Sequence, residues 1–379
     1  MDPKTTLRGS ALYQAFKQTP LYDRLLRWAW MQETRIRTEE RSLFTHEAAQ
    51  HFRSENVPGS LADYKKALRR HRVTYQEYMY GYEYWKLDEA ARDAFISRSE
   101  MQCIYRKMVT REVRQTFRDK TAFLRRFAPF VHRDWKRAEE LSLEEFRAFV
   151  ECHDVIAKPL DGTCGEGIFK IQASKVQQWE ELYARCRDQH LLLEECVRAC
   201  EPLEQLHPTS LNTIRVVTLS KGDKFAIFGA LLRMGAHGSV IDNTHAGGVF
   251  APINPDTGCI DTPAIDALNH RYERHPDTDV PIVGFAIPHW EQIVETCRQA
   301  ARVMPDLRFA GWDLCPLADG RIELIEGNHA PDFDGGLQAP LKVGVKQKLQ
   351  KTASEIFGID ILELIQTTSR TYNNYEGML

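Results

Sequence analysis

The chain has 379 residues, with 50 lysine and arginine residues against 53 aspartate and glutamate residues and a formal net charge of -3. This near balance gives no general electrostatic case for nucleic acid or an anionic membrane surface as the main partner. The length suggests two or three domains.

The nine cysteines are scattered and contain no C-x-x-C pair. We therefore expect reduced thiols and a cytoplasmic location. The opening residues, "MDPKTTLRGS", lack the apolar core of a signal peptide, and no stretch approaches the roughly twenty apolar residues of a membrane-spanning helix. We expect no membrane insertion, and the oligomeric state is open.

Residues 1–118 are predicted to be mostly helical. They are rich in aromatic and charged residues, and their apolar residues recur every three or four positions in "LYDRLLRWAWMQETRIRTEE" and "EYMYGYEYWKLDEAARDAFI". This spacing is typical of amphipathic helices. We expect the tyrosine and tryptophan stripes to be core rather than a binding platform.

From about residue 150 the sequence predicts short strands that alternate with helices. The predicted strands are "DVIAKPL", "GIFKIQ", "HLLLEECV", "NTIRVVTLS", "KFAIFGALLRM" and "RIELIEGN". The predicted helices are "KVQQWEELYARCRDQ", "HWEQIVETCRQAARVM" and "LKVGVKQKLQKTASEIFG". This alternation favours an α/β or α+β body. Residues 371–379 are predicted to be a loose tail.

The segment "VIAKPLDGTCGEGIFKI", residues 155–171, combines Lys158 with glycines at Gly162, Gly165 and Gly167. The spacing fits neither a Walker loop nor a dinucleotide fingerprint. What remains is a strand, a glycine-rich flap and a return strand, in which backbone N–H groups and the lysine would approach phosphate. A flexible surface hairpin with a solvated lysine is the alternative.

The segment "GWDLCPLADGRIELIEGNHAPDFDG", residues 311–335, contains a strong hairpin signal in its Asp-Gly dipeptide at 319–320. A two-residue turn that pairs Ala318 with Arg321 would place Asp313 directly opposite Glu326.

Strand alternation would bring Asn328 to the same face as this carboxylate pair. Like charges directly opposed on a sheet destabilise it, and a bound cation would resolve the conflict. Two carboxylates and an amide carbonyl suit Mg²⁺. The alternative is an exposed hairpin end with solvated acids.

Two arginines lie on otherwise apolar predicted strands that turn at "KGDK". These are Arg215 and Arg233, and each guanidinium needs an anionic partner, for which phosphate is the natural candidate. Glu194 and Glu195 end the strand "LLLEE", where backbone groups would read an adenine edge; edge-strand acids facing solvent are the alternative. The flap and the hairpin together indicate Mg²⁺ with a nucleoside triphosphate between them.

The order of these segments resembles the ATP-grasp superfamily over about residues 115–335. The resemblance implies an α+β fold in which two lobes clamp ATP, preceded by a mostly helical N-terminal region. It divides the chain into the helical region 1–118, a small lobe 119–200 with the flap, a large lobe 201–370 with the metal and substrate site, and the tail 371–379.

The resemblance also implies residue roles. The phosphate or adenine lysine would be Lys120 in "DKTAFLRRF", and the second lysine would be Lys158, followed by the flap glycines. Adenine would meet Glu194, Glu195 and Val197, and the ribose acid would be Glu204 or Glu201. Arg233 would neutralise negative charge on the transferring phosphoryl group. Arg215 would either share this role or bind the substrate carboxylate. The metal set would be Asp313, Glu326 and Asn328, with Mg²⁺ and possible Mn²⁺.

The chain is similar in particular to the sugar-transfer-associated ATP-grasp proteins. The segments that carry this resemblance are "EYMYGYEYWKLDEAARDAFIS", "DKTAFLRRFAPF", "HPTSLNTIRVVTL" and "IEGNHAPDF". The loop "GAHGSVIDNTHAGGVF", residues 235–250, is similar to the substrate loop of peptide-forming members through Asn243, His245, Gly247 and Gly248.

The resemblance predicts an ATP-dependent carboxylate–amine ligase that forms an acylphosphate and ADP and then an amide. Its partners would be small-molecule carboxylate and amine substrates, whose identities the sequence does not give. One alternative is a kinase without amine transfer. Another is a nucleotide-binding regulator in an envelope-glycan or natural-product pathway. A metal hydrolase is disfavoured because the sequence has no H-E-x-x-H or other histidine-rich ligand set.

Overall fold

A computed structural model describes residues 59–75, 77–160, 167–238, 242, 247–331 and 337–366. The predicted helix over 21–40 and the predicted tail over 371–379 lie outside these residues. The described chain divides into two compact units. Unit 1 contains residues 59–65, 134–160 and 167–196, and unit 2 contains the remaining described residues.

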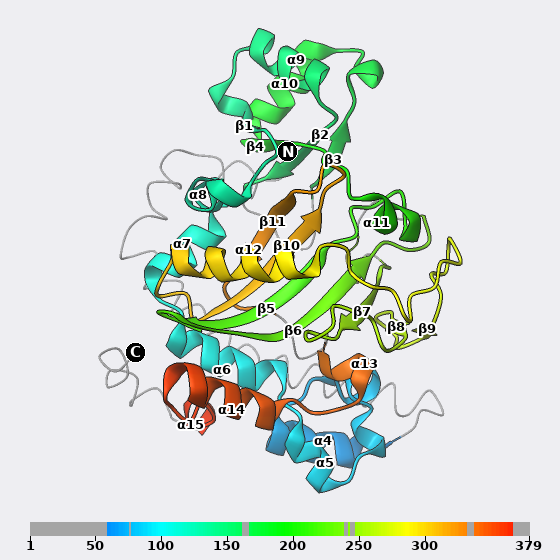
Figure 1. Ribbon diagram of the computed structural model, residues 1–379, viewed down its shortest axis with the longest axis vertical. Coiled ribbons are helices and arrows are strands. Elements are labelled where there is room, and N and C mark those ends of the chain that lie inside the picture. Colours follow the sequence, from blue (N-terminus) through cyan, green and yellow to red (C-terminus); the bar gives the residue numbers. More distant parts are fainter. Residues whose placement is uncertain are drawn as a thin grey trace. The chain divides into compact units, whose positions relative to one another are not determined.

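Unit 1 contains a four-stranded antiparallel sheet in the order β1-β4-β2-β3. These strands are β1 (Trp135–Arg137), β2 (Val155–Pro159), β3 (Phe169–Ile171) and β4 (Leu191–Glu195). Two helices, α9 (Leu143–Cys152) and α10 (Trp179–Asp188), cover one face (Figure 1). Their Phe146 and Cys186 join alternate strand residues, including Val155 and Leu193, in one core cluster. The intervening strand residues, Lys158 and Glu194 among them, therefore point to the other face.

Unit 2 contains a seven-stranded antiparallel sheet in the order β11-β10-β5-β6-β7-β8-β9. The strands are β5 (Ile214–Lys221), β6 (Lys224–Met234), β7 (Val249–Ile253), β8 (Ala264–Ile265), β9 (Arg271–Tyr272), β10 (Phe309–Pro316) and β11 (Ile322–Asn328). The β5–β6 hairpin turns at "KGDK" as predicted, with Lys221 paired to Lys224.

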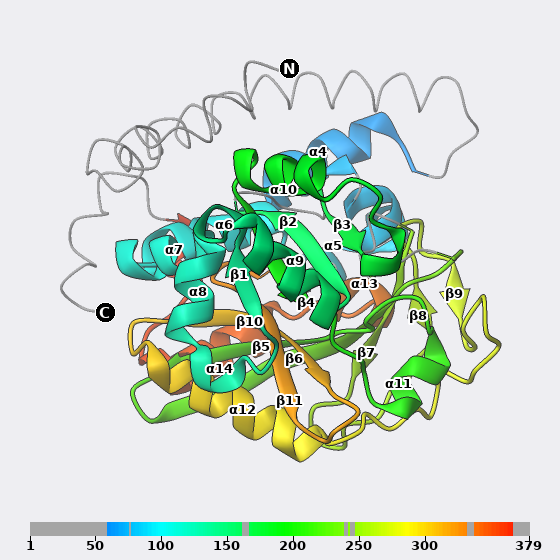
Figure 2. The same cartoon turned by 90° about the horizontal axis from the view of Figure 1, so that it is seen from above.

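Helices cover both faces of this sheet. The core of one face joins Val217 and Phe309 of the strands to α6 (Arg98–Met108) and α14 (Lys346–Phe357). The helix α12 (Trp290–Val303) packs on β10, β11 and β5. Figure 1 shows α12 on the opposite side of β5 and β6 from α6 and α14, and Figure 2 shows it running along β10 and β11.

The remaining helices are short and lie mainly in unit 2. They are α4 (Leu61–His71), α5 (Glu89–Ala94), α7 (Arg111–Arg118), α8 (Lys120–Arg126), α11 (Glu201–Leu206), α13 (Ala339–Leu341) and α15 (Glu363–Gln366). One π-helical turn, Glu77–Gly81, and four 3-10 turns, Tyr84–Lys86, Ala128–Phe130, Ala138–Glu140 and Ala173–Lys175, complete the described helical segments.

The predicted α+β fold is confirmed. All six predicted apolar runs contain strands, and the three predicted helices contain α10, α12 and α14. The segment "EYMYGYEYWKLDEAARDAFI" is helical as predicted, but its helical structure is divided into a π turn, a 3-10 turn and α5. The positive φ of Glu83 and the Asp88 side chain, which caps α5 by accepting from Ala91 N, separate these pieces.

Three tyrosines of this broken segment are core residues, as predicted. Tyr78, Tyr82 and Tyr84 are fully buried, and the ring of Tyr82 lies 4.9 Å from that of Phe95. The Tyr82 hydroxyl donates to Ile96 O at 3.2 Å. A buried hydroxyl with a partner explains why tyrosine is tolerated at this depth.

The cysteines of the described residues are free thiols. In the same residues, no helix has the length and apolar character needed to cross a membrane.

Candidate active site

The β10–β11 hairpin brings the predicted metal-site acids together. Asp313 pairs directly with Glu326, and Gly311 pairs with Asn328. Because directly opposed residues of an antiparallel pair share a face, and alternate residues share it too, Asp313, Glu326 and Asn328 lie on one face. The predicted pairing is confirmed.

The predicted turn is wrong by one residue. Leu317 N, rather than Ala318 N, donates to Arg321 O at 2.8 Å, while Ala318 N donates to Arg198 O at 3.2 Å. Gly320 adopts the positive φ, +86°, that a glycine accepts without strain. The loop therefore has three residues instead of two, and the pairing next to it is shifted by one.

A bulge in β11 restores the predicted pair. Leu314 pairs with Leu324, whereas the next residue, Asp313, pairs with Glu326, so Ile325 is the extra residue. The three-residue loop shifts the pairing by one residue, and the bulge shifts it back by one, so Asp313 still pairs with Glu326 as predicted. Beyond the bulge the register is the predicted one.

Asp313 is buried and is bound by both predicted arginines. Arg215 contacts the two carboxylate oxygens through Nε and Nη2, with Nη2 2.7 Å from Oδ2, and Arg233 Nη1 lies 3.0 Å from Oδ2. Burial alone would raise the pKa of the Asp313 carboxyl, but the charges and hydrogen bonds of Arg215 and Arg233 hold it below its usual range.

These contacts correct two expectations. The anionic partner of Arg215 and Arg233 in this structure is a protein carboxylate, so their burial does not itself require phosphate. The two guanidinium groups also compensate the negative charge of Asp313 without a metal ion, so charge conflict with Glu326 is not by itself an argument for a metal. The oxygen-donor chemistry of the set remains its connection with Mg²⁺.

Glu326 differs from Asp313 in its surroundings. Its side chain is exposed, and it has no hydrogen-bond or ion-pair partner within the part of the chain that the structure describes. Asn328 is half-buried. The face therefore offers one carboxylate held by guanidinium groups and one carboxylate open to a ligand.

Asp242 is a second carboxylate beside Arg233, and sequence reasoning missed it. It accepts from Thr213 N at 3.0 Å and from the Thr213 hydroxyl, and its Oδ1 lies 3.4 Å from Arg233 Nη2. Its position directly before Asn243 in the predicted substrate loop was an available signal. Asn243 and His245 lie outside the described residues. Gly247 is exposed with a φ of +90°, and Gly248 is buried.

In unit 1, Lys158 forms an ion pair with Glu194. Lys158 Nζ lies 2.5 Å from Glu194 Oε2, and the side chains are only 13% and 7% exposed. The alternative of a solvated lysine is thus wrong. So is the alternative of solvent-facing edge-strand acids, because β4 lies between β1 and β2.

The strand and the return strand are present as predicted, and residues 161–166 of the predicted flap lie outside the described residues. Strands β2 and β3 pair antiparallel, and Gly167 lies just before β3 with a φ of +74°. A Cβ at Gly167 would lie 3.0 Å from Cγ of Pro159, so the chain there favours glycine on both counts. Gly162 and Gly165 lie outside the described residues.

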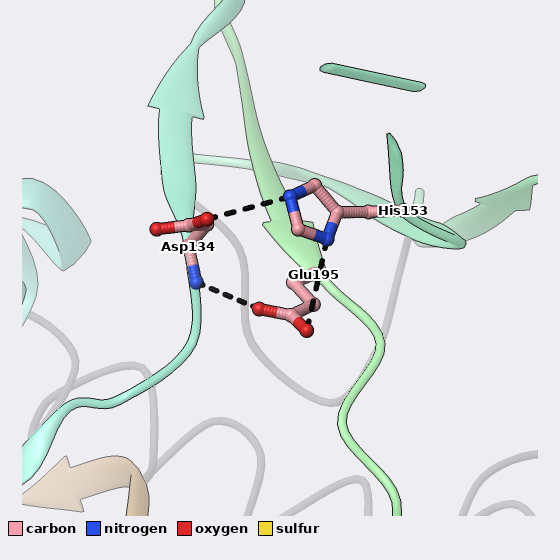
Figure 3. A group of neighbouring side chains, drawn as sticks. All are labelled: Asp134, His153 and Glu195. Carbon is pink, nitrogen blue, oxygen red and sulfur yellow. Dashed lines mark hydrogen bonds and ion pairs between the residues drawn. The ribbon is translucent and has the colours of Figure 1, made fainter. Parts of the chain in front are cut away.

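Glu195, predicted to meet adenine, belongs to a group with Asp134 and His153 (Figure 3). The His153 ring nitrogens face one carboxylate each, with Nε2 3.4 Å from Asp134 Oδ2 and Nδ1 3.6 Å from Glu195 Oε1. Glu195 Oε2 also accepts from Asp134 N at 3.0 Å. One histidine ring lies between both acids and faces each of them through a nitrogen, so their proximity does not require a metal. Val197, two residues further on, is half-buried.

The other predicted nucleotide residues have protein partners of their own. Lys120 begins α8, whose N-cap is Asp119, and the Asp119 carboxylate accepts from Thr121 N at 2.9 Å. The acid before this lysine is therefore a helix cap. The carboxylate of Glu204 is held bidentately by Arg198 at 3.1 and 3.0 Å. Glu201 accepts from Gln205 at 3.1 Å.

Comparison with known families identifies this chain. The profile of the sugar-transfer associated ATP-grasp family matches residues 135–354, which is more than half of the sequence. The chain therefore belongs to this ATP-grasp family. No curated protein sequence matches it.

Several solved ATP-grasp structures are similar to this chain. The ligase PsnB, complexed with a minimal precursor, Mg and ADP, has 14% sequence identity and a TM-score of 0.40, covering 69% of this chain and 62% of PsnB. The L-amino acid ligase from Bacillus licheniformis has 12% identity and a TM-score of 0.37, covering 66% and 47%. The N5-carboxyaminoimidazole synthase from Aspergillus clavatus has 12% identity and a TM-score of 0.35, covering 60% and 52%. This chain thus spans less than two thirds of each of them.

Proposed function

We propose that this protein is an ATP-dependent ligase that joins a carboxylate to an amine. The observation that carries the proposal is the pairing of Asp313 with Glu326, with Asn328 on the same face, in a chain of the ATP-grasp family. Two carboxylates and an amide suit Mg²⁺, which keeps several waters and takes further oxygens from phosphates.

Asp313, Glu326 and Asn328 would hold Mg²⁺ or Mn²⁺, which when bound neutralises negative charge on the nucleotide phosphates. The exposed carboxylate of Glu326 could bind such an ion directly. The Asp313 carboxylate could bind it only after giving up hydrogen bonds from Arg215 or Arg233. Guanidinium groups released from Asp313 would in turn meet phosphate oxygens, because a bidentate fork fits either anion.

Cations of the chain would act on the transferring phosphoryl group. Arg233, Arg215 and Lys158 each have a carboxylate partner in the structure, so nucleotide binding would exchange one anion for another. This exchange limits the cost of keeping buried cations in the nucleotide-free protein. Lys120 and the flap glycines would contribute further phosphate contacts, and Glu194, Glu195, Val197 and Glu204 would contact the nucleoside.

The proposed reaction has two balanced steps. A substrate carboxylate oxygen attacks the γ-phosphorus of ATP, and the bond to the β-phosphate oxygen breaks, giving an acylphosphate and ADP. The amine nitrogen then attacks the acyl carbon, phosphate leaves with the C–O bond electrons, and the amine proton passes to solvent or a loop base. Such chemistry depends mainly on positioning and charge neutralisation.

The test measures ADP release from MgATP by the purified protein with pooled carboxylates, with and without pooled amines. Glu326→Gln should fold normally and abolish release, because its carboxylate has no structural partner among the described residues. Glu291→Gln, the same change at an exposed site on α12, serves as the matched control.

Release that requires one acid and one amine supports the ligase. Release without any amine would instead indicate a kinase. Wild-type release from the Glu326→Gln variant would refute the metal assignment, and binding of MgATP without turnover in any pool would favour a nucleotide-binding regulator.

A further inference from the structure

One buried arginine binds the bulge of β11. Arg133 Nη1 donates to Leu324 O at 2.8 Å, and Nη2 donates to Ile325 O at 2.9 Å. The same guanidinium contacts the carboxylate of Glu323, and the Arg133 and Glu323 side chains are 2% and 0% exposed. The other Glu323 oxygen accepts from His132 N at 2.8 Å.

The two carbonyls that Arg133 binds belong to consecutive residues. In a regular strand, successive carbonyls point to opposite edges, so one guanidinium does not bond both. At the bulge, Leu324 O and Ile325 O converge on the same group. The planar fork of an arginine suits this arrangement, because its donors have fixed and divergent directions.

The bulge decides which face of the sheet Glu326 occupies. The pairs Pro316 with Ile322 and Leu314 with Leu324 set the register near the turn. If that register continued, Ile325 would lie opposite Asp313, and Glu326 would move to the other face.

Asn328 would move with Glu326, because it is two residues further along the same strand. The oxygen set around Asp313 would then be lost without any change in its own residues. We propose that Arg133 and Glu323 are positioning residues that fix the β11 bulge and thereby hold Glu326 and Asn328 beside Asp313. This inference rests on the proposed metal role of those three residues.

The main variant is Arg133→Leu combined with Glu323→Leu. It removes the clamp without leaving a buried unpaired charge, and apolar replacement of a buried ion pair is often tolerated. The measured quantity is the factor by which Mn²⁺ tightens ATP binding, from titrations with and without the metal. We expect this factor to fall at least about tenfold, the equivalent of one lost charge-assisted contact, while metal-free ATP affinity stays within about twofold.

Deletion of Ile325 provides a rescue that a merely structural role would not predict. Without this residue, the register at Leu324 continues directly to Glu326 opposite Asp313, and no bulge is needed. Deleting Ile325 in the double variant should therefore recover the Mn²⁺ effect. Arg92→Leu, which removes a buried arginine that bonds Tyr84 O in the same unit, should lower stability but preserve the effect.

The outcomes separate the two proposals. If the wild type shows no Mn²⁺ effect, the proposed function and this inference fail together. If the wild type shows it and the double variant keeps it, or if deletion of Ile325 does not restore it, only this inference is overturned. Should the double variant not fold, Arg133→Lys replaces it; a lysine keeps the charge but lacks the fork, and an unchanged Mn²⁺ effect in that variant also overturns the inference.

Discussion

Asp313 and Arg215 lie directly opposite each other on β10 and β5, and the arginine holds both oxygens of the carboxylate. Arg233 binds the same carboxylate from β6. A buried anion thus sits between two cations at the centre of the candidate site.

We expect Asp313→Asn to destabilise the protein in the absence of nucleotide. The substitution removes the buried negative charge that Arg215 and Arg233 share, at a typical cost on the order of 3 to 5 kcal/mol in the free energy of unfolding. Urea denaturation measures it. Asp319→Asn in the same hairpin removes only an exposed, solvent-screened pair with Arg321 and should cost far less. Equal losses in the two variants would contradict this account.

Lys158→Met should weaken binding of nucleotides in proportion to their phosphates. If Lys158 transfers from Glu194 to phosphate, ATP affinity should fall about tenfold or more, while adenosine affinity should change less than about twofold. Calorimetric titration of both ligands checks this. Lys170→Met, at a half-exposed lysine of β3 paired with Asp154, is the matched control. Equal losses for adenosine and ATP would place Lys158 away from the phosphates.

Asp242→Asn should lower turnover more than nucleotide affinity. The carboxylate ties Arg233 to the start of β5 through Thr213, so its loss misplaces a proposed phosphoryl-contacting guanidinium. Misplacement of this kind costs roughly ten- to a hundredfold in kcat. Thr213→Val removes only the hydroxyl contact and should give a smaller loss. Steady-state kinetics with a carboxylate and an amine that support ADP release test this, and an unchanged kcat in Asp242→Asn would count against this role.

His329, which directly follows β11, predicts a pH dependence of stability. Burial, together with the charges of Arg118 and Arg114, lowers its pKa from 6.5 to about 4. Between pH 6.5 and about 4, His329 is therefore protonated in the unfolded chain but still neutral in the folded chain. The contribution of His329 to the free energy of unfolding is complete above pH 6.5 and decreases as the pH falls toward 4.

Replacing His329 by Gln should flatten that pH dependence. The urea midpoint of the variant should fall less between about pH 7 and about pH 4.5 than that of the wild type. Parallel pH profiles for the two proteins would show that His329 does not titrate as its surroundings indicate.

The candidate site was predictable as far as local patterns determine it. The alternation of "RIELIEGN" and the Asp-Gly dipeptide indicated the hairpin and the Asp313–Glu326 pair. They did not indicate the three-residue loop or the bulge, because the bulge carbonyls bond to Arg133, which is far away in the sequence. A local pattern does not contain that contact.

The carboxylate partner of Arg215 and Arg233 could not be predicted from local sequence patterns either. An arginine on an apolar strand calls for an anion, but the pattern around Arg215 does not distinguish a ligand phosphate from a carboxylate on another strand. Asp313 is 98 residues later, and only the adjacency of β5 and β10 makes it the partner. Asp242 was missed because loop residues have no periodicity that indicates where their side chains bond.

The core of unit 2 has a consequence for synthesis on the ribosome. Ile104 and Met108 of α6 pack with Val217 of β5 and with Ile356 of α14. At about 5–20 residues per second, the last of these partners emerges on the order of ten to fifty seconds after α6. During that interval the apolar face of α6 has no native partner from α14. Nascent chains of this protein should therefore be chaperone clients until α14 has left the ribosome.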